Sequence, residues 1–322
     1  MLGLLAAFSM LVAPLTSEAQ QAGKIYHVGL LSTGTDPARP VRWQPFIEAM
    51  RALNYVEGRN LVIKPAFASG KTDRLPGLVT DLVAAKVDVI VTTGTRETIA
   101  ARRATSSIPI VMTVVPDPVA QGLATSLARP GGNVTGLTNL VPGLSQKYVE
   151  LLREVVPSAT RLAVVASPPN PVPENRRELE AAARALGMTV SIVQASGPDE
   201  FDSVLGQAKK DGAAGIIVTA DPVTFLHRRT LVRLALKHRL PGIYWDREYV
   251  EEGGLMTYSA SFADLLRRAA TYVVKILRGA RPADLPVEQP MRFELMINPK
   301  TAKALRLTIP PSVLVRADEV IQ

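Results

Sequence analysis

The sequence predicts an α/β protein built from two doubly wound lobes of parallel strands, and three observations support this fold class. Short runs rich in β-branched residues alternate with helix-like segments along most of the chain. The alternation occurs twice in succession, each time in the order β-α-β-α-β-α-β. Stretches rich in proline and glycine interrupt it at three places. We therefore expect the chain to pass between the lobes three times, so that they share a three-stranded hinge.

The first half of the alternation predicts the first lobe. Its opening strand, residues 25–32 (IYHVGLLS), is almost continuously apolar, as expected for a strand buried on both faces. The elements predicted after it are a helix ending at 46–53, a strand at 60–65, a helix at 75–85, a strand at 87–92, a helix at 97–105 and a strand at 108–114. A junction at 129–143, which contains the turn sequence PGGN, ends this half.

The second half repeats the pattern. The elements predicted in it are a strand at 161–166, a helix at 174–186, a strand at 189–194, a helix at 199–211, a strand at 215–219, a helix at 227–238 and a strand at 240–244. A second junction at 253–258, a long helix at 262–277, a proline-rich passage at 281–290 and a strand at 293–298 follow. The predicted lobes are residues 25–138 plus 257–285 and residues 139–256 plus 286–322.

The N-terminus has the character of a signal peptide. Residues 2–15 are apolar and uncharged, a run too short to span a bilayer but suited to a signal-peptide core. Ser17 and Ala19 provide small residues at the −3 and −1 positions of a cleavage site before Gln20. We expect residues 1–19 to be removed, and no cysteine follows that could carry a lipid anchor.

The composition argues against several functional classes. The chain has no cysteine, and its histidines, His27, His227 and His238, lack metal-ligand spacing, so we expect no metal and no cofactor. The net charge of +8 is spread over separate pairs of basic residues, not gathered in one stripe, so we expect no nucleic acid partner. The sequence contains no Gly-x-Ser-x-Gly, Gly-x-Gly-x-x-Gly or His-Glu-x-x-His motif, and we expect no enzyme.

The candidate ligand-binding residues lie at the carboxyl ends of the predicted strands, where open α/β sheets bind small molecules. They are Ser32, Thr33, Thr93, Gly94, Thr95 and Asp117 in the first lobe, and Asn170, Asp221, Tyr244 and Trp245 in the second.

The stretch VTTGT, residues 91–95, ends a strand and begins a helix. Its hydroxyl and amide groups can bind an anionic or polar end of a solute at the helix N-terminus. The other interpretation is ordinary helix capping by Thr95, which Glu97 in the first turn supports. Arg96 next to it either binds a carboxylate or is a solvated residue of the first turn.

Asp117 and Asp221 occupy matching places in the two halves, and each precedes a proline. Either can receive an ammonium or hydroxyl group of a ligand, or form a turn that ends the strand. Of the two tryptophans, we expect Trp245 to face the ligand and Trp43 to lie in a core or on the surface of its lobe.

Several longer phrases carry a resemblance to a known family. They are KIYHVGLLSTG at 24–34, VDVIVTTGT at 87–95, GLATSLARPGGNVTGLTNL at 122–140 and FELMINPKTAKALRLTIPPSVLVRADEVI at 293–321. In these phrases the chain resembles the ABC-transporter substrate-binding proteins of the tryptophan/tyrosine type, which have the type I periplasmic binding protein fold. The resemblance covers nearly the whole chain after residue 24.

The resemblance implies a monomeric receptor in the periplasm that closes two lobes over a small polar solute, such as an amino acid or related carboxylate. It also implies delivery of the solute to an ABC permease in the inner membrane, with its ATPase. Two pairs depart from the family pattern: Arg96-Glu97 stands where small residues are usual, and Trp245-Asp246 replaces a Gly-Phe-like pair. Both departures fall at the predicted cleft, so the aromatic amino acids bound by some relatives are not carried over.

Two other functions are compatible with this pattern. One is a ligand-sensing receptor of the same fold that passes a signal to a partner protein. The other is an α/β enzyme, such as a hydrolase, which would need Asp117 or Asp221 as its base.

Overall fold

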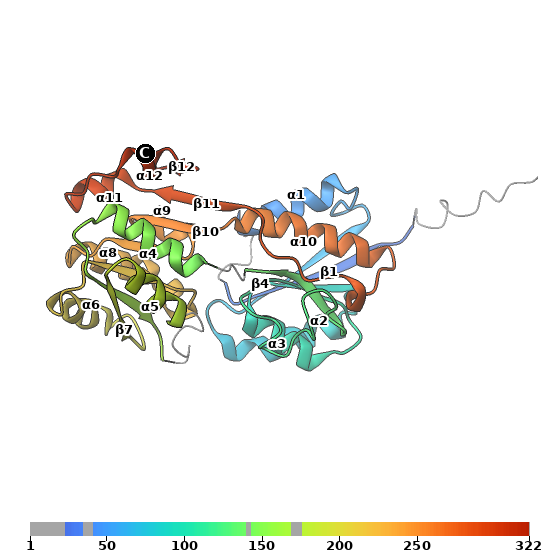
Figure 1. Ribbon diagram of the computed structural model, residues 1–322. Helices are drawn as coiled ribbons and strands as arrows, with labels where there is room; N and C mark the ends of the chain where they lie inside the picture. Colours follow the sequence, from blue (N-terminus) through green and yellow to red (C-terminus); the bar gives the residue numbers. More distant parts are fainter. Residues whose placement is uncertain (1–22, 35–40, 140–142, 169–175, 322) are drawn as a thin grey trace, which may run out of the picture.

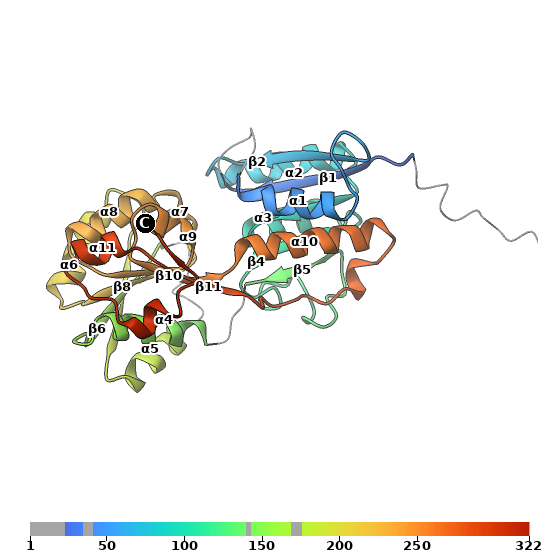
Figure 2. The same ribbon diagram turned by 90° about the horizontal axis from the view of Figure 1, so that it is seen from above.

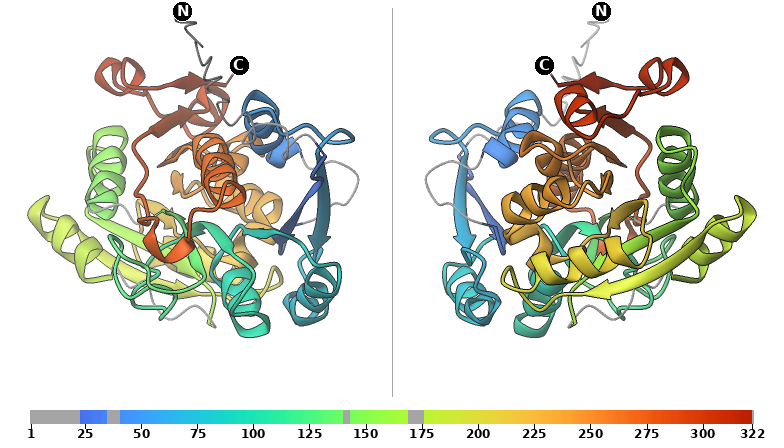
Figure 3. Two further views of the ribbon diagram at one scale, coloured as in Figure 1. Left: turned by 90° about the vertical axis from the view of Figure 1, so that its right-hand side faces the viewer. Right: turned by 90° about the vertical axis from the view of Figure 1, so that its left-hand side faces the viewer.

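The protein contains two separate sheets, each flanked by helices. The computed structural model describes residues 23–34, 41–139, 143–168 and 176–321. Figure 1 shows a first lobe on the right, with β1, β4, α1 to α3 and α10, and a second lobe on the left. The end views of Figure 3 place the first lobe nearer the viewer on the left and the second lobe nearer on the right.

The first lobe has a five-stranded sheet in the order β2-β1-β3-β4-β5, with every pairing parallel. Its elements are β1 (Tyr26–Ser32), η1 (Val41–Trp43), α1 (Gln44–Ala52), β2 (Leu61–Phe67), η2 (Thr72–Arg74), α2 (Leu75–Ala84), β3 (Val89–Thr92), α3 (Thr95–Ala104), β4 (Ile110–Val115), β5 (Val134–Thr138) and α10 (Phe262–Leu277). Helices α1 and α10 pack on one face of this sheet, and α2 and α3 on the other. Every residue of β3 is therefore buried.

The second lobe has a seven-stranded sheet in the order β12-β11-β10-β9-β8-β6-β7, in which only the described β10–β11 pairing is antiparallel. Its elements are α4 (Leu144–Val155), β6 (Arg161–Ala166), α5 (Arg176–Ala185), β7 (Thr189–Gln194), α6 (Phe201–Lys210), β8 (Gly215–Val218), α7 (Pro222–Leu226), α8 (Arg228–Lys237), β9 (Gly242–Tyr244), α9 (Arg247–Glu251), β10 (Met256–Ala260), β11 (Phe293–Ile297), α11 (Pro299–Ala304), α12 (Pro311–Leu314) and β12 (Glu319–Val320). A short helix η3 (Pro282–Asp284) precedes β11.

The fold class predicted from the sequence is confirmed, with small differences in the elements. The first sheet has the doubly wound order 2-1-3-4-5, and β7-β6-β8-β9-β10 repeats this order in the second sheet. Strand β2 was expected to end at Pro65 but continues to Phe67. This is possible because β2 lies at the edge of its sheet, where a proline without an amide hydrogen breaks no ladder on its open side.

The chain passes between the lobes along three segments, which the view in Figure 2 separates. They connect β5 to α4, β10 to α10, and η3 to β11. The first and third segments are bonded to each other, because Thr138 N donates to Glu288 O at 3.0 Å and Glu288 N donates to Gly136 O at 3.0 Å. The second and third continue the β10–β11 pairing, since Ser261 N donates to Arg292 O at 3.0 Å. The three crossing segments therefore form one hydrogen-bonded hinge.

The expected signal peptide, residues 1–19, lies outside the described residues. Within the described ranges, no helix combines the length and apolar character needed to cross a membrane.

Replacement of Gly136 by alanine should strongly destabilise the first lobe. Gly136 has a φ of +130°, and a Cβ built on it would lie 2.1 Å from the backbone oxygen of Met112 on the neighbouring strand. Because the backbone fixes the position of the Cβ and the oxygen it meets belongs to the backbone of a paired strand, neither atom can move away without disturbing the sheet. We expect a loss of about 3 kcal/mol or more in unfolding free energy, measured by denaturant titration. Gly132→Ala is the matched control, since a Cβ there would meet no atom within 4 Å. Equal stability of the two variants would contradict this reading of β5.

Candidate functional site

The carboxyl edges of the two sheets face the lobe boundary. Strand β5 leaves the first sheet at Thr138 toward the second lobe, and β10 leaves the second sheet at Ala260 toward the first. Parallel strands end at the same edge of a sheet. The tips of β1, β3 and β4 therefore lie at the edge where β5 leaves the first sheet, and the tips of β6, β8 and β9 lie at the edge where β10 leaves the second sheet. In each sheet the strand order reverses between two of these tips, β1 and β3 in one and β6 and β8 in the other, which is where such sheets bind ligands.

The predicted residues of the first lobe gather at the β1/β3 switch point. Thr93 Oγ1 donates to Ser32 Oγ at 2.9 Å, which joins the two strand tips. Thr33 makes two further bonds, from its backbone N and its Oγ1, and both go to Glu97 Oε1, at 2.8 and 2.7 Å. The Glu97 side chain is buried, with 3% exposure. A carboxylate of the protein itself therefore binds donor groups that the sequence assigned to a ligand.

Thr95 does not cap helix α3, so the capping interpretation is wrong. Gly94 is its N-cap, no side-chain bond caps it, and Thr95 is its first helical residue. A Cβ on Gly94 would lie 2.7 Å from Glu97 Oε2. The absence of a side chain at Gly94 thus leaves the space that the Glu97 carboxylate occupies.

Asp221 is tightly held at the matching β6/β8 switch point of the second lobe. It is the N-cap of α7, where its Oδ1 accepts bonds from Val223 N at 2.8 Å and Thr224 N at 2.9 Å. Its Oδ2 accepts from Ser167 N at 3.2 Å and from Ser167 Oγ. Asp221 is 2% exposed, and both oxygens are satisfied by the protein.

Asp117 forms a looser turn in the first lobe. Its Oδ1 accepts bonds from Val119 N at 3.1 Å and Ala120 N at 2.9 Å. Both aspartates therefore make the turn that an Asp-Pro pair permits. The expected correspondence of Asp117 and Asp221 is wrong, because Asp117 follows β4, whereas Asp221 follows β8, the counterpart of β3. Asn170, in the segment after β6, lies outside the described residues.

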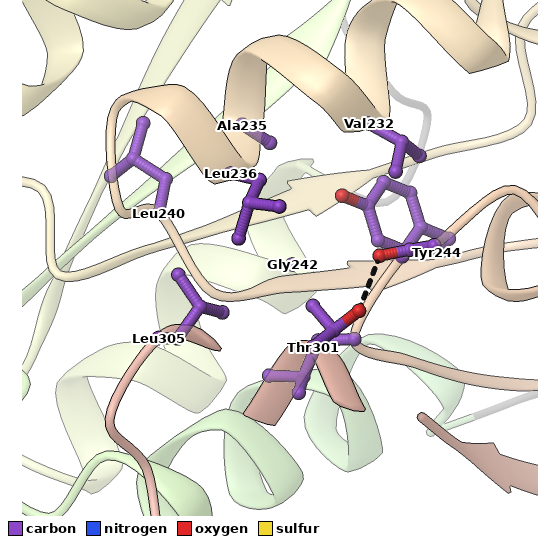
Figure 4. Close-up of a pocket in the computed structure, with 11 residues that line it drawn as sticks. Val232, Ala235, Leu236, Leu240, Gly242, Tyr244, Thr301 and Leu305 are labelled. Atoms are coloured by element: carbon purple, nitrogen blue, oxygen red, sulfur yellow. Dashed lines mark hydrogen bonds between the residues drawn. The ribbon is translucent and has the colours of Figure 1, made fainter. Parts of the chain in front are cut away.

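Tyr244 belongs to the core of the second lobe. Its ring stacks on Tyr249 with centroids 4.9 Å apart, and burial raises the pKa of the Tyr244 hydroxyl well above its ordinary value. Figure 4 shows the ring beside Val232 and above Thr301, at a small cavity lined by α8 and α11. That cavity measures about 10 Å³, which is room for about one water and not for a solute.

Trp245, at the tip of β9, is half-buried in an aromatic group with Phe225 and Tyr249, at centroid distances of 5.3 and 6.5 Å. Trp43 is 2% exposed and packs against Phe46 and Phe67, so it lies in a core, one of the two places expected for it.

A half-buried arginine joins the two lobes. Arg42, in η1 of the first lobe, places Nη2 2.8 Å from Asp246 Oδ2 and also pairs with Glu248, at the start of α9 in the second lobe. Asp246 is 5% exposed, and Glu248 also pairs with Arg228 at 2.7 Å. Desolvation lowers the pKa of the Arg42 guanidinium, but the two carboxylates outweigh it and raise the pKa above its ordinary value.

The Arg42 guanidinium also lies over aromatic rings of both sides of the boundary. Its centre is 3.9 Å from the ring centroid of Phe262, the first residue of α10, and 5.2 Å from that of Phe225 in α7. The bridge therefore lies beside the β10–α10 crossing and against the aromatic group that contains Trp245.

Sequence reasoning missed Arg42 as a site residue and gave Glu97 only a supporting role. The available signals were Arg42's position between a strand tip and a helix, and the acidic residue in the first turn after VTTGT. Among the residues that the structure describes, no group of three His, Asp or Glu side chains could hold a metal ion.

Two mainly parallel sheets joined by three crossings, with polar strand tips turned to the boundary, define a two-lobed protein of the type I periplasmic binding protein class. A family model described as ABC transporter substrate binding protein matches residues 28–321. The chain therefore belongs to this family.

Individual relatives agree with this assignment. The chain is 25% identical over 289 residues to a tyrosine-binding protein of Clostridioides difficile, covering 87% of this chain and 80% of that protein. A solved domain from Streptococcus pneumoniae in complex with L-Trp has a TM-score of 0.84 and 26% identity, over 92% of this chain and all of that one. A conserved domain protein of Vibrio cholerae matches with a TM-score of 0.84 and 28% identity over the same shares.

Replacement of Asp221 by asparagine should destabilise the second lobe. The amide nitrogen would face Ser167, whose backbone N–H would lose its acceptor in a buried place. We expect a loss of about 2 kcal/mol in unfolding free energy. Asp117→Asn is the control, because it makes the same change at another Asp-Pro turn, after β4 of the first lobe, where asparagine caps nearly as well. It should cost less than about 0.5 kcal/mol. A larger loss of unfolding free energy in Asp117→Asn than in Asp221→Asn would contradict the structural role given to Asp221.

Proposed function

We propose that the chain is the periplasmic solute-binding protein of an ABC importer, and that it binds a small polar solute, such as an amino acid or related carboxylate, between its lobes. Membership of the substrate-binding family and the named ligands of the relatives support this proposal. The chain is proposed to act as a monomer, without catalysis, and to present its closed form to a permease in the inner membrane. The binding residues are proposed to be those at the strand tips, including Ser32, Thr93 and Trp245.

The observation that carries the proposal is the Arg42 bridge. Apart from the three hinge segments, the relative position of the lobes depends on contacts such as the ion pair between Arg42 and Asp246. Contacts of this kind exist only when the lobes are together, so a solute that touches both lobes favours the same arrangement. The lobes then close over the solute by rotation at the hydrogen-bonded hinge.

A thermal-shift screen tests the proposal. Purified protein is heated with amino acids, amines, small organic acids, purines and sugars, one compound at a time. A solute at 100 times its Kd adds about 2.7 kcal/mol, which raises Tm by a few degrees for a chain of this size. At least one compound should give such a shift, and its Kd is then measured by calorimetry. Absence of any shift at millimolar concentrations would count against solute binding.

Replacement of Arg42 by methionine should favour the open arrangement of the lobes. Methionine keeps much of the length of the side chain but removes both ion pairs to α9. Because the closed form would then bury the unpaired carboxylate of Asp246, the ligand-free protein should have a larger radius of gyration in X-ray scattering. Arg102→Met, on the exposed side of α3, is the control and should scatter like the parent. An unchanged radius for both variants would show that Arg42 does not hold the lobes together.

A further inference from the structure

We infer that Glu97 receives a positively charged nitrogen of the solute and thereby selects the class of solute that the protein binds. The inference rests on the proposed function, because it concerns the same lobe boundary. Glu97 lies at the β1/β3 switch point, and its carboxylate requires a positively charged partner.

Among the residues that the structure describes, Glu97 has no cationic partner for its buried carboxylate. It is 3% exposed, and none of the Lys, Arg or His side chains in the described ranges lies within 4.0 Å of its oxygens. Its described stabilisation consists of two bonds from Thr33 and its place in the first turn of α3. Burial of a charge is costly unless the charge is paired, so this carboxylate favours a cation supplied from outside the protein.

The two oxygens of Glu97 are unequally satisfied. Oε1 accepts both bonds from Thr33, whereas Oε2 accepts none from the described residues and lies against the bare Cα of Gly94. Asp221, the buried carboxylate at the matching switch point, has two donors on each oxygen. Asp221 is therefore complete without a ligand, and Glu97 retains an acceptor for one.

The position of Glu97 suits contact with a solute held between the lobes. Thr33, which binds Glu97, accepts a bond through its backbone oxygen from Gly70 N at 2.7 Å. A Cβ built on Gly70 would lie 3.2 Å from the side chain of Leu226, in α7 of the second lobe. The loop of Gly70 therefore reaches the second lobe, and it is bonded to Thr33, which holds the Glu97 carboxylate at the β1/β3 switch point. Sheets of this kind bind ligands at that point.

This arrangement defines what the site accepts. A solute carboxylate cannot share the Thr33 donors with Glu97, because two carboxylates at one site repel each other unless one is protonated. An ammonium or guanidinium group can bind Oε2 and compensate the buried charge. The solutes in question are amines and amino acids that turn their amino group toward the first lobe. Acids without an amine, and amines whose charge has been removed by acylation, do not fit.

Calorimetric titration of matched compounds tests the inference. The probes are L-tyrosine, L-tryptophan, L-ornithine, tyramine and putrescine, each compared with the derivative in which every amine is acetylated. In the parent protein, acetylation of the amine should weaken binding about 10- to 100-fold, because it removes one hydrogen-bonded ion pair. In Glu97→Gln, which keeps the shape of the side chain and an acceptor for Thr33, this preference should disappear. Glu48→Gln, the same change on the exposed side of α1, should retain the full preference.

The outcomes separate the inference from the proposed function. Equal binding of an amine and its acetylated form by the parent protein would overturn the inference while leaving solute binding intact, and this comparison needs no variant. An unchanged preference in Glu97→Gln would also overturn it. A Tm of unliganded Glu97→Gln close to that of the parent shows that any loss of binding comes from the charge and not from unfolding. If no compound of either series, or of the wider screen, binds the parent protein, the proposed function fails and the inference fails with it.

Discussion

Backbone hydrogen bonds between Glu288 and the end of β5 hold together the connection on which the two-lobed structure depends. Glu288 donates to Gly136 and accepts from Thr138, so the segment that returns to the second lobe is bonded to the strand that first leaves the first lobe. The β10–β11 pairing holds the remaining crossing in the same way. A hinge of paired segments restricts the lobes to rotations that preserve these bonds. This restriction keeps the carboxyl edges of the two sheets turned to the same boundary.

At that boundary, each sheet uses a buried acid to join a strand tip to the next helix. Glu97 connects α3 to the tip of β1, and Asp221 connects α7 to the residue after β6. The shared geometry follows from the repeated strand order, because the reversal opens a space between two tips where helix amides and hydroxyls need an acceptor. The lobes differ in how completely the acid is satisfied, and a ligand can use only the incomplete one.

Much of the architecture could be predicted because its signals are local. The apolar run at 25–32 predicted β1 to within one residue. The repeated alternation predicted two lobes, and the three interruptions rich in proline and glycine predicted three crossings. Trp43 lies in a core, one of the two places expected for it. The short helices α7 and α9 were missed because five residues are too few to show helical periodicity, although Asp221 and Asp246 are suitable N-caps.

The details of the candidate site depended on information that no local pattern contains. Arg42 and its partner Asp246 are 204 residues apart, so nothing near either one indicates the other. Tyr244 and Trp245 are neighbours at one strand tip, and successive side chains of a strand point to opposite faces of the sheet. Only the packing of the whole lobe determines that Tyr244, and not Trp245, enters the core. Glu97 points inward because Gly94 has no side chain, which is a steric relation and not a motif.

Helix α10 has a consequence for how the chain reaches this structure. It covers one face of the first sheet, although its residues follow β10 of the second lobe. Tyr272, Val273 and Leu266 complete the same apolar cluster as Val28 and Val91. A nascent chain therefore cannot finish its first lobe until the strands of the second lobe up to β10 have been synthesised. Until then α1 covers only part of that face, and the apolar part that α10 buries is a surface to which a chaperone can bind.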